Sequence, residues 1–388
     1  MSIISKRVWI LSLISMFADI ASEMLYPVIP AYLRNIGFSV LLIGILEGIA
    51  EFTVGLSKGY FGKLSDTKGV RIPFIKIGYF LSALSKPMMA ILPYAGWVLL
   101  ARTTDRLGKG VRTAARDALL SDEATTKTKA RIFGFHRAWD TTGAIIGPLL
   151  ALAFLHFQPG NYARLFYLAF IPGMIAVLLI FLLRERRTPA TSGSTGFFSF
   201  FAYWKKAAPA YRKLVWGLTL FAIANSSDIF LLLKVKEVTG DDTTTILIYL
   251  LYNLVFALIS FPAGILADRI GMKKIFVTGL LLFIVVYTGF AFTTRTWMAY
   301  ALFIVYGVYA ACTEGIAKAW ISNLASTKET ATAIGLFTTI QSIATLAAST
   351  LAGLLWYYAG SSAVFLFSAS IVAIVVTGLL ATRLEEKA

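Results

Sequence analysis

The sequence has 388 residues, of which 58% are hydrophobic and only 14% are charged, and its mean hydropathy is +0.75. A soluble globular protein carries about a quarter charged residues, so the composition excludes that class. The formal net charge of +16 at pH 7 could suit a nucleic-acid partner, but the basic residues lie mostly in alternate loops, which argues against one.

Apolar runs of about 20 residues recur along almost the whole chain, a pattern typical of a polytopic membrane protein. We expect an all-α fold, because a membrane β-barrel would show shorter segments of alternating polarity. The runs predict twelve transmembrane helices, the first six near 8–33, 38–62, 73–93, 97–119, 131–157 and 165–183. The second six are expected near 214–234, 244–266, 274–292, 297–320, 331–357 and 362–382.

A polar segment, 184–213, separates the two sets of spans and is rich in Ser, Thr, Gly and Pro at its start. It predicts a linker between an N-terminal six-helix bundle (1–183) and a C-terminal one (214–388). The aromatic run 197–204 is expected at the membrane surface. Because Lys and Arg are concentrated in alternate loops, we expect both termini and the linker in the cytoplasm.

The expected fourth span holds an unusual number of charges for a membrane helix, where each costs about 2.5–3.5 kcal/mol near the centre. They recur at spacings of three and four, on one side of a helix: Arg102, Asp105, Arg106, Lys109, Arg112 and Arg116. On other spans, two acidic residues, or a histidine and an aspartate, lie four residues apart. Such groups usually face a bundle interior or a wet cavity. The candidates for proton coupling or cavity lining in the first half are Asp19, Glu23, Glu47, Glu51, Asp105, Arg106, Lys109, His136 and Asp140.

These charges allow two interpretations. One is a proton-coupled site in which carboxylates exchange a proton for a cationic group. The other is a static network of salt bridges that holds the first half together. The second half is poorer in charge and offers a more neutral, aromatic wall, whose candidates are Asn225, Asp228, Tyr249, Asn253, Glu314 and Gln341.

The two halves repeat a loop motif, once after the second span and once after the eighth. Its glycines allow a tight turn, and its aspartate can pair with nearby basic groups. The candidate gating residues are Gly62, Asp66, Gly69, Arg71, Gly264, Asp268, Arg269 and Gly271. A basic loop that only sets topology is the simpler alternative. The segment 130–134 also matches 331–335, so the chain is a six-plus-six duplication, an architecture typical of transporters.

These loop motifs resemble the signature of the major facilitator superfamily, although Thr67 stands where the family has Arg or Lys in the first copy. The expected fifth span carries Gly134, Gly143, Gly147 and Pro148 in the pattern that the family's antiporters and drug exporters share, with Ala151 in place of its last glycine. The run 105–117 resembles a branch of uncharacterised prokaryotic permeases. The resemblance implies two pseudo-symmetric six-helix bundles and a monomer.

We therefore expect a multi-pass protein of a prokaryotic cytoplasmic membrane that exports a small organic compound in exchange for protons, with no cofactor. No GxxxxGK[ST] loop is present, which argues against an ATP-driven pump. A divalent-metal exporter remains an alternative, with ligands from Asp19, Glu23, Glu51, His136 and Asp140, although the arginines would repel the ion. A membrane enzyme or lipid-modifying protein is the other alternative, but no nucleophile is evident. The single cysteine, Cys312, excludes an internal disulfide.

Overall fold

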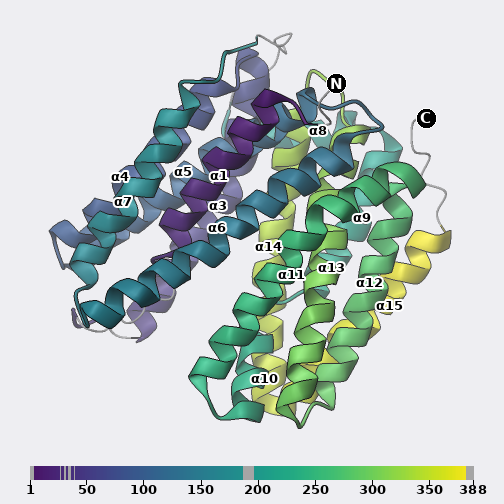
Figure 1. Ribbon diagram of the computed structural model, residues 1–388. Helices are drawn as coiled ribbons and strands as arrows, with labels where there is room; N and C mark the ends of the chain where they lie inside the picture. The colour runs from purple at the N-terminus through teal and green to yellow at the C-terminus, as the bar shows by residue number, and fades with distance from the viewer. Residues whose placement is uncertain are drawn as a thin grey trace. The chain divides into compact units, whose positions relative to one another are not determined.

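The computed structural model describes residues 4–26, 28–29, 32–33, 36–38, 40–186 and 196–381, with the backbone alone for 40–48, 50–51 and 242–243. This part of the chain is helical and contains no strand (Figure 1). The helices of the first half are α1 (Lys6–Glu23), α3 (Val40–Lys68), α4 (Ile72–Ile91), α5 (Ala95–Asp122), α6 (Lys129–Phe157) and α7 (Tyr162–Ile180). Those of the second half are α9 (Pro209–Ala224), α10 (Ile229–Thr239), α11 (Asp242–Ile270), α12 (Met272–Ala291), α13 (Thr296–Leu324), α14 (Thr330–Ala359) and α15 (Ser361–Ala381).

Eight helical segments of the described chain are long and apolar enough to cross a membrane. They are α6, α7, the combined α9 and α10, and the helices from α11 to α15. α5 is as long as these, but its charged residues keep it out of the set. The expected all-α membrane fold is confirmed, and the charge that makes α5 unusual has to be explained by its surroundings.

The seventh span is not the continuous helix expected near 214–234. α9 ends at Ala224 and α10 begins at Ile229, so residues 225–228 interrupt the helix. Their sequence, Asn-Ser-Ser-Asp, explains the break, because these side chains compete with the helix for backbone hydrogen bonds. The first span, expected near 8–33, is interrupted similarly, since α1 ends at Glu23 and a turn follows at 24–26. Discontinuous helices of this kind often form binding sites in transporters.

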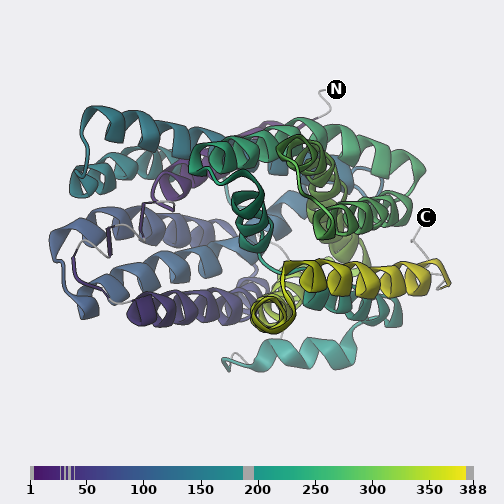
Figure 2. The same ribbon diagram turned by 90° about the horizontal axis from the view of Figure 1, so that it is seen from below.

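The chain forms two compact units. Unit 1 comprises 1–123, 139–206 and 326–339, and unit 2 comprises 124–138, 207–325 and 340–388. In unit 1, α5 packs between α3 and α4, and α7 packs against α4 and α1; α3, α4 and α5 lie side by side in Figure 2. In unit 2, α13 packs against α11 and α12, and α15 packs against α12 and α9. The start of α6 belongs to unit 2, and the start of α14 belongs to unit 1.

The aromatic run 197–204 packs against protein through Phe200 and Tyr203, whereas Phe197, Phe198 and Phe201 stay exposed, and its expected position at the membrane surface stays a prediction. It forms a 3-10 turn, η1 (Ser199–Ala202), and the short helix α8 (Tyr203–Lys206). η1 packs on α3, where the ring of Phe200 is fully buried against Gly59. Phe197 lies 5.1 Å from Tyr60 between ring centroids. The absence of a side chain at Gly59 makes room for the Phe200 ring.

Candidate functional site

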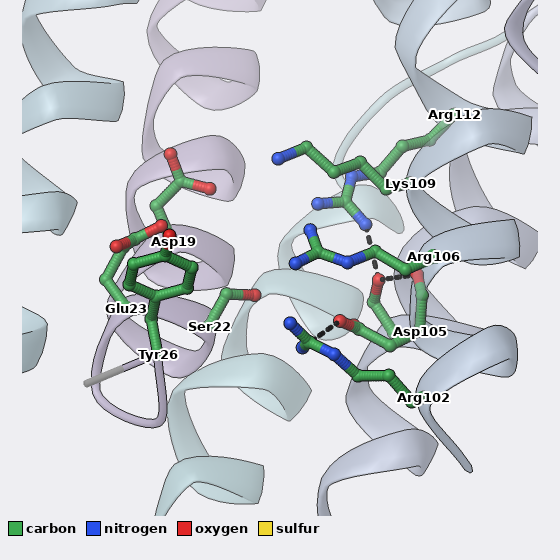
Figure 3. A pocket seen from close by; sticks show the side chains of 10 residues that line it. Asp19, Ser22, Glu23, Tyr26, Arg102, Asp105, Arg106, Lys109 and Arg112 are labelled. Atoms are coloured by element: carbon green, nitrogen blue, oxygen red, sulfur yellow. Dashed lines mark hydrogen bonds and ion pairs between the residues drawn. The ribbon is translucent and has the colours of Figure 1, made fainter. Parts of the chain in front are cut away.

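Unit 1 contains a polar cavity of about 200 Å³ between α1, α4 and α5. It is lined by Asp19, Ser22, Glu23, Tyr26, Ser82, Arg102, Asp105, Arg106, Lys109 and Arg112. Figure 3 shows Asp19 and Glu23 of α1 on one wall, facing the basic side chains of α5 on the other. The cavity brings together five of the candidates for proton coupling, namely Asp19, Glu23, Asp105, Arg106 and Lys109, together with Arg102 and Arg112 of the same charged helix.

The third carboxylate of the cavity, Asp105, is engaged by two bases. Lys86 of α4 donates to its Oδ1 at 2.8 Å, and Arg102 lies 3.6 Å from its Oδ2. The Lys86 ammonium also donates to Ser22 Oγ at 3.2 Å. All three charged side chains are at most 11% exposed. Asp105 is therefore the shared partner of the buried Lys86 and Arg102 on the basic side of the cavity, and Asp19 and Glu23 form the acidic wall.

Arg112 is held in place at the basic wall. Its Nη1 donates to Ser82 Oγ at 2.6 Å, and its guanidinium lies over the ring of Tyr79, 4.2 Å from the centroid. The Ser82 hydroxyl in turn donates to the Asp105 carbonyl oxygen at 3.2 Å. A cation stacked on an aromatic ring and anchored by a hydrogen bond keeps its orientation without a ligand.

A second polar cluster lies next to the cavity and involves Asp140 of α6. The Ser15 hydroxyl donates to Asp140 Oδ1 at 2.5 Å, and Arg116 Nη1 donates to Ser15 Oγ at 2.8 Å. The Arg116 guanidinium also pairs with Asp117 at 2.9 Å and lies 4.0 Å from Asp140. The Asp140 carboxyl is a side-chain neighbour of Asp19. The acidic wall of the cavity is thus continuous with this cluster.

α6 approaches α1 closely at this point because it carries glycines. A side chain at Gly143 would collide with the Met16 carbonyl oxygen, and its Cβ would lie 3.0 Å from the Cβ of Asp19. At Gly147 an added Cβ would lie 2.7 Å from the Met24 nitrogen. Pro148 follows within the same helix. These glycines let α6 place Asp140 beside Asp19.

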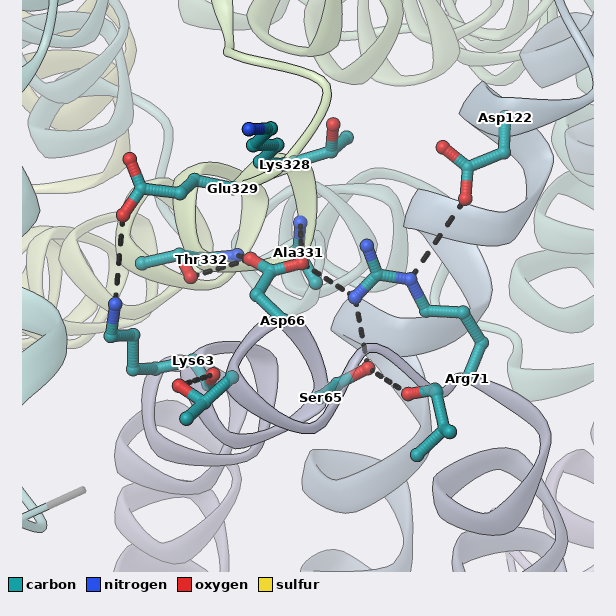
Figure 4. A network of polar contacts seen from close by, with 12 residues as sticks. Lys63, Ser65, Asp66, Arg71, Asp122, Lys328, Glu329, Ala331 and Thr332 are labelled. Carbon is teal, nitrogen blue, oxygen red and sulfur yellow. Dashed lines mark hydrogen bonds and ion pairs between the residues drawn. The ribbon is translucent and has the colours of Figure 1, made fainter. Parts of the chain in front are cut away.

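The first copy of the motif lies largely within the last turns of α3, which extends to Lys68 rather than ending near residue 62, and it forms a buried network around Asp66 (Figure 4). The carboxylate accepts from the Thr332 backbone nitrogen at 2.6 Å, from Thr332 Oγ1 at 2.5 Å and from the Ala331 nitrogen at 3.4 Å. Arg71 pairs with it at 2.6 Å and donates to Ser65 Oγ at 2.9 Å. Both Asp66 and Arg71 are completely buried.

The second copy of the motif makes the equivalent contact in unit 2. Asp268 accepts from the backbone nitrogens of Ala130 and Arg131, each at 3.0 Å, and from Arg131 Nε at 2.9 Å. A side chain at Gly264 would collide with the Ala130 carbonyl oxygen. Arg131, the basic partner of Asp268, is 26% exposed, whereas Arg71, the basic partner in the first copy, is buried.

Each motif aspartate therefore caps the first turn of a helix, Asp66 at α14 and Asp268 at α6. Free N–H groups and the helix dipole both favour a carboxylate at that position. Gly69 and Gly271 end the motif helices with φ of 64° and 104°, a conformation that favours glycine. Arg269 is exposed. The matched segments 130–134 and 331–335 are thus the partners of the two motifs.

Asp228, a candidate of the second half, lies in an aromatic region of unit 2. The Tyr306 hydroxyl donates to Asp228 Oδ1 at 2.6 Å, next to the break between α9 and α10. The Tyr306 ring lies 5.1 Å from those of Tyr252 and Tyr309. Glu314 pairs with Arg137. A carboxylate among tyrosines offers hydrogen bonds and aromatic faces but little net charge.

The remaining candidates are placed as follows. Glu47 and Glu51 lie outside the described side chains, His136 is buried in α6, and Gln341 is half-buried. The Asn253 amide donates to the carbonyl oxygen of Tyr249 one turn earlier.

Sequence reasoning missed Lys86, whose only signal was a lysine inside an apolar run. Among the described side chains, no three His, Cys, Asp or Glu residues form a group that could hold a metal ion.

Comparison with known proteins gives consistent matches. A sequence model of the Major Facilitator Superfamily matches residues 11–249 and 214–388. The chain is 32% identical over 360 residues to an uncharacterised MFS-type transporter of Methanocaldococcus jannaschii, with 91% of this chain and 89% of the relative covered. It is 24% identical over 190 residues to the quinolone resistance protein NorA of Staphylococcus aureus, about half of each chain (49% and 48%). The crystal structure of the human organic anion transporter MFSD10 matches with a TM-score of 0.79 at 17% identity, covering 96% of this chain and 98% of that one.

Proposed function

Because the chain belongs to the major facilitator superfamily of membrane transporters, we propose that it exports a small organic compound in exchange for protons. Family membership supports transport across a membrane rather than enzymatic turnover. To family membership the proposal adds that the coupling ion is a proton and that the organic compound moves out of the cell. It also takes the proton gradient as the energy source without a cofactor, a monomer as the working form, and a cytoplasmic location for both termini in a prokaryotic membrane.

The observation that carries the proposal is the adjacency of two carboxylates, Asp19, which lines the cavity, and Asp140, which lies next to Asp19 on α6. Two carboxylates that share a site of low dielectric repel each other, and a proton bound between them relieves that repulsion. Asp140 is 7% exposed, so solvent screens this repulsion weakly. A cationic group that enters the cavity would relieve the same repulsion and displace the proton. Competition of this kind couples the two movements in opposite directions.

Two further features support a conformational cycle. The aspartates of the two loop motifs cap helices α14 and α6 through hydrogen bonds to backbone N–H groups. Glycines at these contacts let helix backbones approach closely, as Gly62 does at the Ala331 carbonyl oxygen. We propose that these contacts close the cytoplasmic side and break when the transporter opens to the cytoplasm. The distant likeness to a drug-resistance protein favours export over uptake.

The test measures proton movement in everted membrane vesicles that contain the chain. A fluorescent weak base reports the pH gradient while cationic, zwitterionic, anionic and neutral organic compounds are added in turn. At least one compound should release protons only in vesicles with the chain. Asp19→Asn and Asp140→Asn, which remove the exchangeable protons, should lower the initial rate at least tenfold.

Glu237→Gln is the matched control, because that carboxylate is 47% exposed and its partners are Lys234 in the same helix and the hydroxyl of Ser361. It should leave the rate unchanged at equal protein content. Unchanged rates in both Asp19→Asn and Asp140→Asn would refute the carboxylate pair as the coupling site. Uptake of a compound without any proton release would refute proton exchange itself.

Close packing of α6 on α1 should be as important as the carboxylates. Gly147→Leu is expected to lower the initial transport rate at least tenfold, because the added side chain must displace the α1 backbone at Met24 and Ile20. A Cβ added at Gly378 in α15 would meet no atom within 4 Å, so Gly378→Leu serves as the control for an added side chain of the same size. Equal rates for the two variants, at equal amounts in the membrane, would show that this contact is dispensable.

A further inference from the structure

We propose that the cavity of unit 1 binds zwitterionic solutes. Their cationic group would lie at Asp19 and Glu23 on α1, and their anionic group at the basic residues Arg106, Lys109 and Arg112 on α5. This inference rests on the proposed function for its role in transport and adds the class of substrate. The site itself is a matter of binding and can be tested without transport.

The first observation is the separation of charge between the two walls. The carboxylates come from α1 and the bases from α5, and they face each other across the cavity (Figure 3). The spacing of three and four residues along α5 puts Arg102, Arg106 and Lys109 on this face. A site that paired its charges only for stability would not require a solvent-sized space between the walls.

The second observation is the composition of the two walls. Asp105 pairs with Lys86 and Arg102. The rest of the lining includes two carboxylates on α1 and three bases on α5, namely Arg106, Lys109 and Arg112. A solute with only a positive charge would be repelled by the α5 wall, and one with only a negative charge by the α1 wall. A zwitterion provides a cationic group for the carboxylates of α1 and an anionic group for the bases of α5, so each attraction between the walls is replaced by an attraction to the solute.

The geometry of the basic wall suits a small anionic group. Arg112 is oriented in advance by Ser82 and Tyr79, so little ordering is required when an anion binds. A guanidinium can give two parallel hydrogen bonds to a carboxylate or phosphate. The cavity of about 200 Å³ is smaller than the about 300–1,000 Å³ of typical drug sites, which favours a compact solute such as an amino acid.

The charge of the solute also determines the sign of coupling. A cationic group at Asp19 competes with a proton, which gives exchange. A solute with only a negative charge would bind better when Asp19 is protonated, which would give cotransport instead. A zwitterion is therefore the class that satisfies both walls and still exchanges with protons.

The test uses the purified full chain and matched probes that share one carbon skeleton. Phenylalanine is the zwitterion, phenylalaninamide the cation, N-acetylphenylalanine the anion and N-acetylphenylalaninamide the neutral compound. Two further series, on glycine and on γ-aminobutyrate, vary the size and the separation of the charges. Binding is measured by calorimetry and by the shift of the thermal unfolding midpoint. In at least one series the zwitterion should bind at least tenfold more tightly than each analogue.

Two variants should change the charge preference in opposite directions, which simple misfolding cannot do. Arg106→Gln should reduce the difference in binding affinity between the zwitterion and the cation. Asp19→Asn should reduce the difference in binding affinity between the zwitterion and the anion. Lys213→Gln, an exposed base at the start of the second half, should change neither. The proposal is overturned if the zwitterion is not the tightest-binding probe in any series. It is also overturned if each variant changes the binding affinity of all the probes by the same factor.

The outcomes separate this inference from the proposed function. Zwitterion binding without proton release in vesicles would refute proton exchange and keep the binding site. Proton release driven only by cations, with no effect of any zwitterion, would refute the zwitterion site and keep proton exchange.

Discussion

Replacing Asp105 by alanine is expected to destabilise the protein by about 3–5 kcal/mol, the range found when one partner of a buried ion pair is removed. The change leaves Lys86 and Arg102 without their shared carboxylate, and these side chains are 5% and 7% exposed. Asp105→Asn should be nearly as harmful, because the amide keeps the shape but not the charge. The measurement is the thermal unfolding midpoint of the purified protein.

A double variant separates loss of charge balance from loss of packing. In Lys86→Met with Asp105→Leu, an apolar pair of similar size replaces the ion pair, and such replacements are often close to neutral. The double variant should therefore be more stable than Asp105→Ala. If it is equally unstable, the role of Asp105 is not to balance Lys86.

Asp66→Ala is expected to have the second-largest effect, and Asp268→Ala provides a comparison within the same chain. At Asp66 the substitution leaves Arg71 fully buried without its closest carboxylate, so we expect a loss of about 3–5 kcal/mol. At Asp268 the partner, Arg131, is 26% exposed and can be hydrated, so the loss should resemble that of charged hydrogen bonds, about 1.5–3 kcal/mol.

The measurement again is the unfolding midpoint, together with the initial transport rate. Both variants should slow transport, because each removes the cap of a helix that the proposed cycle must hold and release. Asp66→Ala should lower the midpoint more than Asp268→Ala. The reverse order, or equal shifts, would mean that the burial of Arg71 does not determine the strength of the first contact.

The fold class and the family could be predicted from the sequence because hydropathy and the motifs report them directly. The gathering of Asp105, Arg106 and Lys109 on one side of α5 also followed from helical spacing alone. Their partners did not. Lys86 comes from a neighbouring helix, and the donors to Asp66 lie 265 and 266 residues further along the chain. Contacts over such separations leave no periodic signal in a single sequence.

The breaks after Glu23 and Ala224 were missed for a different reason. A hydropathy window averages over about 20 residues, so a few non-helical residues inside an apolar run are invisible to it. At 225–228 the run Asn-Ser-Ser-Asp was an available signal, since these residues favour turns over helix interiors. At 24–26 the available signal was Pro27, which directly follows the turn, because a proline disfavours helical conformation in the residue before it.

The caps on α14 and α6 have a consequence for how this sequence can change over time. Asp66 belongs to the first repeat, but its donors, Ala331 and Thr332, belong to the second. Asp268 belongs to the second repeat, and its donors, Ala130 and Arg131, belong to the first. These backbone N–H donors are supplied by every residue except proline, so residues 130, 131, 331 and 332 can change widely without loss of the caps. Mutual dependence between the repeats is limited to the aspartates and the two side-chain donors, Thr332 Oγ1 and Arg131 Nε.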